Sequence, residues 1–405
     1  MALHDILMDR IEWLSQFSAD EQGGLSRLLY APDWLKTQEL IRGDMAKKGF
    51  ATRYDSVGNL FVRLNGTEDK TVLIGSHIDT VRSGGRLDGQ YGVMAGLMAL
   101  EELRSRFGQP RLNVEVVSMA EEEGSRFPYA FWGSKNIIGK PERCDIRHLQ
   151  DADGVYFVDA MREAGFDFQP DDATPRRDLH AYLEWHIEQG GVLERENKSV
   201  GVVTAIVGQK RFTIDVTGEA NHAGTTPMPY RKDALAAASG MIWAVRQYAL
   251  AGGDPLVATV GKIEVVPNTS NVVPGAVHFT LDIRHTSATA LADAEHGILQ
   301  EIRRVAAACG VDVSIQRYMN ESPVPMDAHL IDALEQYLAR SDFNYRIMHS
   351  GAGHDAQIFA PHVPSVMLFV PSIGGISHNP AEATKPEDLA VGLKALIGFV
   401  HELAY

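Results

Sequence analysis

The chain has 405 residues and a formal net charge of −15 at pH 7. Such a charge repels polyanions, so neither nucleic acid nor an anionic membrane surface is an expected partner, whereas a small anionic substrate needs only a local cation. Hydrophobic residues make up 45% and charged residues 22%, which is typical of a globular protein with two or three domains. With two cysteines, no signal-peptide pattern and no apolar run long enough to span a membrane, the cytoplasm is the expected location.

The first half of the chain alternates patterns of helix and strand. Apolar residues at helical spacing predict helices, and short apolar or alternating runs predict strands. The expected elements are a helix over 32–48, a hairpin over 51–64, a short buried strand at 72–74 that leads to His77, a helix over 91–107, and strands over 113–119 and 181–187. Strands that alternate with helices favour an α/β sheet with helices on its faces.

The order of predicted helices and strands changes near residue 209. The order strand, helix, strand, strand, helix, strand is that of a ferredoxin-like β-α-β-β-α-β unit. Its expected elements are 210–217, 231–250, 256–265, 276–284, 288–308 and 311–318. After Pro323 and Pro325 the α/β pattern resumes, with a helix over 326–341, strands over 345–348 and 365–370, and a helix over 386–405. We therefore predict a discontinuous domain of residues 1–208 and 326–405, interrupted by an inserted domain of residues 209–325.

Candidate metal ligands follow several predicted strands. These residues are His77, Asp88, Glu123, His186 and His378. Two imidazoles and a carboxylate that bridges a pair of divalent ions form a set able to polarise a carbonyl group and activate water. Any one of these residues alone is more often a surface or hydrogen-bonded group. Their common position at strand ends or in adjoining loops favours a metal site.

The acidic run from Glu121 to Glu123 has two interpretations. A short charge run is usually a solvated turn, but carboxylates packed together after an apolar strand are costly without a cation. If Glu123 binds metal, Glu122 is placed to act as the general base. Asp79 lies two residues after His77, on the same side of an extended chain, so we expect it to orient the imidazole ring.

These residues lie in motifs that resemble the metal-dependent amidohydrolases of the M20 peptidase superfamily. The similar branch holds N-carbamoyl-L-amino-acid hydrolases, β-alanine synthases and allantoate amidohydrolases. The motifs that carry the resemblance are GSHIDT (75–80), GGRLDGQYG (84–92), AEEEGSRF (120–127), HIEQG (186–190), NHAGTTPM (221–228), NVVPG (271–275), DIRHT (282–286), SGAGHDAQ (350–357) and GISHNPAE (375–382). They cover nearly the whole chain and together are very specific.

The resemblance implies a zinc-peptidase-like catalytic domain with a mixed sheet, and an inserted lid that also forms a homodimer contact. It further implies two divalent ions per subunit, with manganese or zinc favoured and cobalt or nickel as alternatives. By the resemblance His77 and His186 hold one ion, Glu123 and His378 hold the other, and Asp88 bridges them. Glu122 is then the general base, and Asp79 orients the imidazole ring of His77.

The same resemblance assigns residues to the substrate. His222 reaches the partner subunit's active site and stabilises the oxyanion. The remaining substrate residues are Gln189, Asn271, Arg284 and His354, with Arg284 as the fork that clamps a carboxylate. Each has a simpler interpretation as well, because His222 and Asn271 fit turns, Arg284 fits a surface salt bridge, and His354 lies in a glycine-rich loop.

Two segments, 120–139 and 350–382, are most similar to the allantoate amidohydrolases within the branch. Gln357 fits this assignment, because a substrate with two ureido groups needs more hydrogen-bond partners than one with a single carbamoyl group. The implied reaction hydrolyses a ureido C–N bond of allantoate to ureidoglycine, ammonia and carbon dioxide in purine catabolism. The alternatives are an N-carbamoyl-L-amino-acid hydrolase and, less similar, an exopeptidase or aminoacylase.

Overall fold

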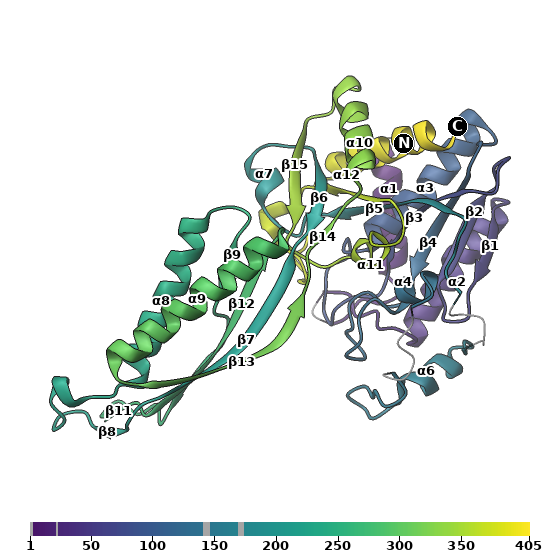
Figure 1. Cartoon of the computed structure of the whole chain (residues 1–405). Helices are drawn as coiled ribbons and strands as arrows, with labels where there is room; N and C mark the ends of the chain where they lie inside the picture. Colours follow the sequence, from purple (N-terminus) through teal and green to yellow (C-terminus); the bar gives the residue numbers. More distant parts are fainter. Residues whose placement is uncertain (1–2, 22, 141–145, 169–173) are drawn as a thin grey trace. The chain divides into compact units, whose positions relative to one another are not determined.

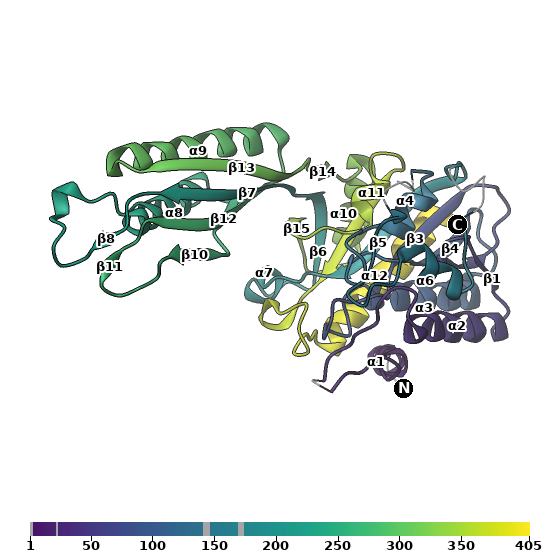
Figure 2. The same ribbon diagram turned by 90° about the horizontal axis from the view of Figure 1, so that it is seen from below.

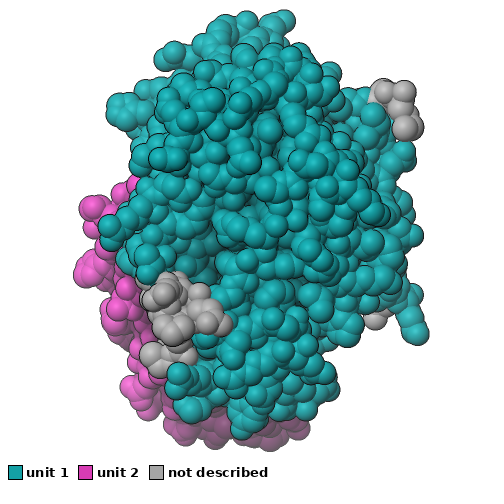
Figure 3. Space-filling model, turned by 90° about the vertical axis from the view of Figure 1, so that its right-hand side faces the viewer, with its two compact units in different colours: residues 1–204, 326–405 teal, residues 205–325 magenta. Residues whose placement is uncertain are grey.

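A computed structural model of the chain describes residues 3–21, 23–140, 146–168 and 174–405. The chain divides into two compact units, which Figure 3 shows in different colours. Unit 1 comprises Met1–Thr204 and Met326–Tyr405, and unit 2 comprises Ala205–Pro325. Unit 1 is therefore discontinuous in sequence. Within the described ranges, no helix is both long and apolar enough to cross a membrane.

Unit 1 is built around a mixed sheet. Its strands are β1 (Ala51–Tyr54), β2 (Leu60–Leu64), β3 (Thr71–His77), β4 (Asn113–Met119), β5 (Leu179–Ile187), β6 (Val200–Ile206), β15 (Tyr345–Ser350) and β16 (Ser365–Val370). The strand order is β1-β2-β4-β3-β5-β16-β6, and β15 also pairs with β6. Strands β4, β3, β5 and β16 are parallel to their neighbours in this central stretch, whereas β1, β2 and β6 pair antiparallel.

Helices pack against both faces of this sheet (Figures 1 and 2). The helices of unit 1 are α1 (Leu3–Ser15), α2 (Pro32–Lys47), α3 (Gln90–Phe107), α4 (Trp132–Ile137), α6 (Phe157–Glu163), α7 (Val192–Arg195), α10 (Ala328–Arg340), α11 (Ala356–Phe359) and α12 (Pro386–Ala404), with the 3-10 turn η3 (Ile373–Gly375). Side chains of strand β5 contact a helix on each face of the sheet. Trp185 lies against Phe399 of α12, and Tyr182 stacks on Phe359 of α11.

Burial on both faces explains the composition of the central strands. Every residue of β3, β4 and β16 is buried. Strands covered by helices on both sides read as continuous apolar runs rather than alternating ones. The candidate site residues lie at the ends of these strands, whereas Glu115 of β4 and Glu184 of β5 are buried acids within them.

Unit 2 has an antiparallel sheet with two long helices. Its elements are β7 (Gly208–Thr217), β8 (Asn221–His222), η2 (Met228–Tyr230), α8 (Ala234–Gly252), β9 (Val257–Thr259), β10 (Ile263–Val266), β11 (Val272–Val273), β12 (Ala276–His285), α9 (Ala288–Cys309), β13 (Asp312–Glu321) and β14 (Val324–Pro325). The sheet order is β10-β12-β7-β13, with β9 also paired to β12. Helices α8 and α9 pack against it, and alternate residues of β7 are fully buried, so one face is covered.

The observed elements follow the predicted order, with local differences. Helix α8 begins at Ala234 rather than at residue 231, because the Asp233 side chain accepts hydrogen bonds from two backbone amides and caps the helix there. The single strand expected over 256–265 is two strands, β9 and β10. Helix α1 and strand β6 were not predicted.

Candidate metal centre

The parallel strands of unit 1 end at one edge of the sheet. His77 is the last residue of β3, and His186 lies one residue before the end of its parallel neighbour β5. The acidic run from Glu121 to Glu123 follows β4, the other parallel neighbour of β3. Because the carboxyl ends of parallel strands meet at one edge, these side chains converge although they are far apart in sequence.

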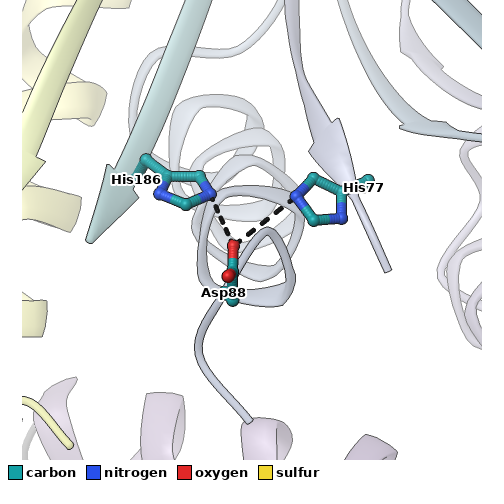
Figure 4. A group of neighbouring side chains, drawn as sticks. All are labelled: His77, Asp88 and His186. Carbon is teal, nitrogen blue, oxygen red and sulfur yellow. Dashed lines mark ion pairs between the residues drawn. The ribbon is translucent and has the colours of Figure 1, made fainter. Parts of the chain in front are cut away.

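Asp88 completes a buried cluster with the two histidines. Figure 4 shows both imidazole rings turned toward its carboxylate. Oδ1 of Asp88 lies 3.1 Å from Nε2 of His186 and 3.6 Å from Nε2 of His77. His77, Asp88 and His186 are here called the first triad. Each offers one ligand atom, and these three atoms lie within 4.8 Å of one another.

A second set of ligands uses the other oxygen of the same carboxylate. Nε2 of His378 lies 3.0 Å from Oδ2 of Asp88 and 3.5 Å from Oε1 of Glu123. Asp88, Glu123 and His378 form the second triad. The two triads share Asp88 alone, and a third group of potential ligands, His77 with Glu122 and Glu123, lies beside them.

Glycine is required where the chain turns from Asp88 into α3. Gly89 has φ +62°, and a Cβ there would lie 2.5 Å from the ring of His77. Both the left-handed backbone and the close approach exclude a larger residue. A side chain at this position would displace a candidate ligand.

The geometry of the donor atoms fits divalent cations. Nδ1 of His77 lies 2.9 Å from the backbone oxygen of Asp79, and Nδ1 of His186 lies 2.9 Å from that of Ile187. A neutral ring that donates from Nδ1 presents the lone pair of Nε2. Nε2 of His186 accepts the backbone N–H of Gly89 at 3.0 Å and also lies beside Asp88. Oε1 of Glu123 is buried without a hydrogen-bond partner. Nitrogen and oxygen donors without thiolate suit zinc, manganese, cobalt or nickel.

The cluster carries more negative charge than its protein surroundings balance. Burial, followed by the charge of Asp88, raises the pKa of Glu123 to about 7. Burial also raises the pKa of Glu122 well above its usual range. The hydrogen bond with Asp88 is the main cause that raises the pKa of His378 to about 9. The cluster therefore attracts positive charge, which protons or metal cations supply.

The family model of peptidase family M20/M25/M40 matches residues 73–402. The chain belongs to this family. The M20 chain is 52% identical to an allantoate amidohydrolase of Escherichia coli strain K12, over 98% of its own length and 97% of the relative. It is 42% identical to an allantoate amidohydrolase of Bacillus subtilis strain 168, over 100% of its own length and 99% of that relative. A solved hydantoinase/carbamoylase family amidase from Burkholderia multivorans superposes with a TM-score of 0.94 at 34% identity, covering 99% of this chain and 98% of that one.

Asp79 connects two parts of the M20 site. Its backbone oxygen holds the His77 ring, and its carboxylate Oδ1 is 3.6 Å from the same ring nitrogen. Oδ2 accepts hydrogen bonds from the backbone amides of Glu122 (2.9 Å) and Glu123 (3.1 Å). Oε2 of Glu122 lies 4.0 Å from Nε2 of His77. Asp79 thus fixes the acidic turn as well as the imidazole, and Glu122 lies beside the first triad.

Three predicted substrate residues of unit 1 lie at different distances from the triads. Gln189 Nε2 donates to Oδ2 of Asp88 at 2.8 Å. The ring of His354 packs edge-on against His186, with 4.6 Å between centroids, and Nε2 lies 3.0 Å from the hydroxyl of Ser350. Gln357 lies on α11 and is half-buried. Gln189 therefore contacts the shared carboxylate directly, and His354 contacts a member of the first triad.

The other predicted substrate residues belong to unit 2. His222 on β8 pairs with Val272 of β11, and the backbone oxygen of Asn271 accepts a hydrogen bond from Ala223. Both predicted residues are exposed. The guanidinium of Arg284 donates to both oxygens of Asp282, at 3.1 and 2.9 Å. Within unit 2, His222 and Asn271 lie together on one two-stranded ribbon, and Arg284 lies on β12.

Sequence reasoning missed Glu382 and Ser377. The Glu382 carboxylate accepts hydrogen bonds from the backbone amides of Leu87 and Asp88 and from the hydroxyl of Ser377. Both residues lie in the motif GISHNPAE (375–382), but the sequence does not show what they contact, and an acid in such a turn is commonly solvated. The structure instead buries it against the loop that carries Asp88.

Proposed function

We propose that this protein hydrolyses a ureido C–N bond of allantoate, yielding ureidoglycine, ammonia and carbon dioxide in purine catabolism. The observation that carries the proposal is the full-length likeness to two allantoate amidohydrolases. The two triads around Asp88 support it, because they offer the ligands that a metal-dependent hydrolase needs. The proposed location is the cytoplasm.

The residues around the triads suit hydrolysis of a carbonyl compound. Divalent ions, when bound, supply Lewis acidity to the carbonyl and lower the pKa of water. Glu122 takes a proton from the attacking water and passes it to the leaving nitrogen. The bond between the ureido carbonyl carbon and the nitrogen on the central carbon then breaks, so ureidoglycine leaves and the carbamate decomposes to ammonia and carbon dioxide.

Residues of both units are proposed to bind the substrate. Nδ1 of His222 accepts a hydrogen bond from the Gly224 amide, so the neutral ring carries its proton on Nε2, the donor that an oxyanion needs. Arg284 already forms a fork with Asp282, the geometry with which it would bind the substrate carboxylate. The further proposed contacts come from Gln189, Asn271, His354 and Gln357.

Two ions per subunit are proposed, one for each triad. His77, His186 and Asp88 hold one, and Glu123, His378 and Asp88 hold the other. Manganese or zinc is proposed as the native metal, with cobalt or nickel as alternatives, because nitrogen and oxygen donors suit all four. Metal analysis of the protein as purified, followed by chelation and reloading with each metal, tests both the number and the identity.

Unit 2 is proposed to act as a lid and to form a homodimer contact. It exposes large apolar side chains that its own core does not cover, among them Met228, Tyr230, Trp243 and Leu250. Such exposure is typical of an interaction surface. Light scattering coupled to size exclusion should give a dimer mass, and Trp243→Glu should shift it toward the monomer. A monomeric mass for the unaltered protein would refute this part of the proposal.

A substrate comparison tests the proposed reaction. The metal-loaded protein is assayed with allantoate and with a set of N-carbamoyl-L-amino acids, and ammonia release is measured. We expect allantoate to have the highest kcat/KM. The second candidate, an N-carbamoyl-L-amino-acid hydrolase, is favoured by the likeness to the hydantoinase/carbamoylase amidase, and preferred turnover of a carbamoyl amino acid would establish it instead.

A further inference from the structure

Glu382 joins two loops that lie far apart in sequence. Its side chain comes from the loop of residues 375–382, and the residue is only 3% exposed. Oε1 accepts the backbone N–H groups of Leu87 at 2.9 Å and of Asp88 at 3.0 Å. One carboxylate oxygen therefore fixes the backbone that carries the ligand shared by both triads.

The other oxygen of Glu382 fixes the loop that carries a different ligand. Oε2 accepts the hydroxyl of Ser377 at 2.7 Å, and Ser377 immediately precedes His378. The hydroxyl of Ser377 also lies 3.4 Å from Oδ2 of Asp88. His378 itself has a left-handed backbone, with φ +53°, which a non-glycine residue adopts only when its surroundings hold it there. Hydrogen bonds to Glu382 are part of those surroundings.

The opposite loop leaves space for this carboxylate. A Cβ at Gly85 would lie 2.0 Å from Oε1 of Glu382 and 2.1 Å from its Cδ. Any larger residue at position 85 would displace the Glu382 side chain. The loop of residues 84–89 therefore leaves room for the Glu382 side chain at Gly85 and for the His77 ring at Gly89.

The Glu382 carboxylate lies near Asp88, which already has the Glu123 carboxylate close by, and this placement has an electrostatic cost. Glu382 approaches Asp88 closely enough for their charges to repel, in a region where burial already disfavours ionised acids. A neutral side chain would avoid this repulsion if the role were only to close a turn. A nearby cation offsets it, because the cation attracts both carboxylates.

We propose that Glu382 is a positioning residue that assembles the second triad by holding the Asp88 and His378 loops together. Its hydrogen bonds hold two of the three ligands, Asp88 and His378, whereas the ligands of the first triad other than Asp88 come from β3 and β5. The inference rests on the proposed two-ion site. Loss of Glu382 should therefore weaken the second ion more than the first, because it loosens two ligands of the second triad and only Asp88 of the first.

Metal titration against a competing chelator tests the proposal. The variants are Glu382→Ala, the isosteric Glu382→Gln, and Glu387→Gln as a control with the same change of charge at an exposed position of α12. We expect Glu382→Ala to weaken one of two ions by about 10- to 100-fold, the range typical when a group that supports a metal ligand is removed. Glu382→Gln should recover part of the loss, because its amide oxygen can still accept the two backbone N–H groups, and the control should bind as the unaltered protein does.

A double-variant cycle assigns the affected ion. In a His378→Ala background the second triad is already broken, so adding Glu382→Ala should leave only the smaller effect that acts on the first ion through Asp88. A His186→Ala background should instead leave the Glu382→Ala effect intact. Unchanged affinity in both Glu382 variants, or equal weakening of both ions, would overturn the proposal. If Glu382→Ala does not fold, the metal affinity of Glu382→Gln alone tests the proposal.

These outcomes are separate from those of the proposed function. The titration involves no substrate, so preferred turnover of a carbamoyl amino acid would refute the allantoate reaction and leave the role of Glu382 unaffected. Binding of fewer than two ions by the unaltered protein would remove the premise of the Glu382 proposal, whatever the substrate.

Discussion

The two triads share one carboxylate but differ in how the fold supports them. The His77 and His186 side chains are 2% and 1% exposed, and they come from neighbouring parallel strands. The His378 side chain is 50% exposed and comes from a loop. Sheet hydrogen bonds place the two histidines of the first triad, whereas contacts between loops place Asp88 and His378. We therefore expect the first ion to be held more firmly and the second to exchange more readily with solvent.

Removal of the charge at Asp88 should have the largest effect, because it belongs to both triads. Asp88→Asn is expected to lose both ions and to reduce turnover by about 10³-fold or more. Metal analysis and ammonia release measure the two effects. Asp332→Asn, at an exposed position on α10, is the matched control. Retention of either ion at wild-type affinity would show that Asp88 does not bridge.

Glu122 should matter for turnover and not for metal content. Glu122→Gln is expected to lower kcat by about 10² to 10⁴-fold, the contribution typical of a general base, while both ions remain. The assay combines kinetics with metal analysis of the same sample. Activity near the unaltered level would place the base elsewhere.

Chelation should distinguish the triads directly. With excess chelator the unaltered protein is expected to release its ions in two phases, because only the second triad has an exposed ligand. His378→Ala should abolish the faster phase and His186→Ala the slower one. Release can be followed in a stopped-flow instrument with a chromophoric chelator. A single phase would contradict the difference in exposure on which the comparison rests.

Ser377 should show the smallest effect. Ser377→Ala removes one hydrogen bond to the Glu382 carboxylate and leaves its two backbone donors in place. The expected cost is about 1.5 kcal/mol in the free energy of unfolding, a value typical of a hydrogen bond to a charged group. Urea denaturation measures it. A loss of metal affinity as large as that of Glu382→Ala would assign the loop-joining role to Ser377 instead.

Much of the fold was predictable because its strands are buried on both faces or alternate regularly. Strands β4 and β16 match the predicted ranges, since apolar runs bounded by turns mark them clearly. Strand β6 was missed, although its sequence VGVVTAI is apolar, because it follows a helix of only four residues rather than a full strand-helix unit. Helix α8 was placed three residues early because its cap is an aspartate within a charged run.

The site was predictable where function requires a particular side chain at a strand end. His77, His186 and the acids after β4 were found in this way. Glu382 was not, because two of its partners are backbone amides 295 and 294 positions away, which leave no side-chain pattern in the sequence. The carboxylate of Asp79 likewise bonds to backbone amides of the acidic turn, a contact that only the folded chain reveals.

The discontinuity of unit 1 sets an order of events during biosynthesis. A ribosome that has released residues 1–204 has delivered His77, Asp88, Glu123 and His186, but β16, which must pair with β5 and β6, is still to come. All of unit 2 is translated before His378 emerges. The nascent chain therefore presents an open strand edge and an incomplete metal centre until β16 and His378 arrive, and we expect the second triad to form only after unit 2 has been translated.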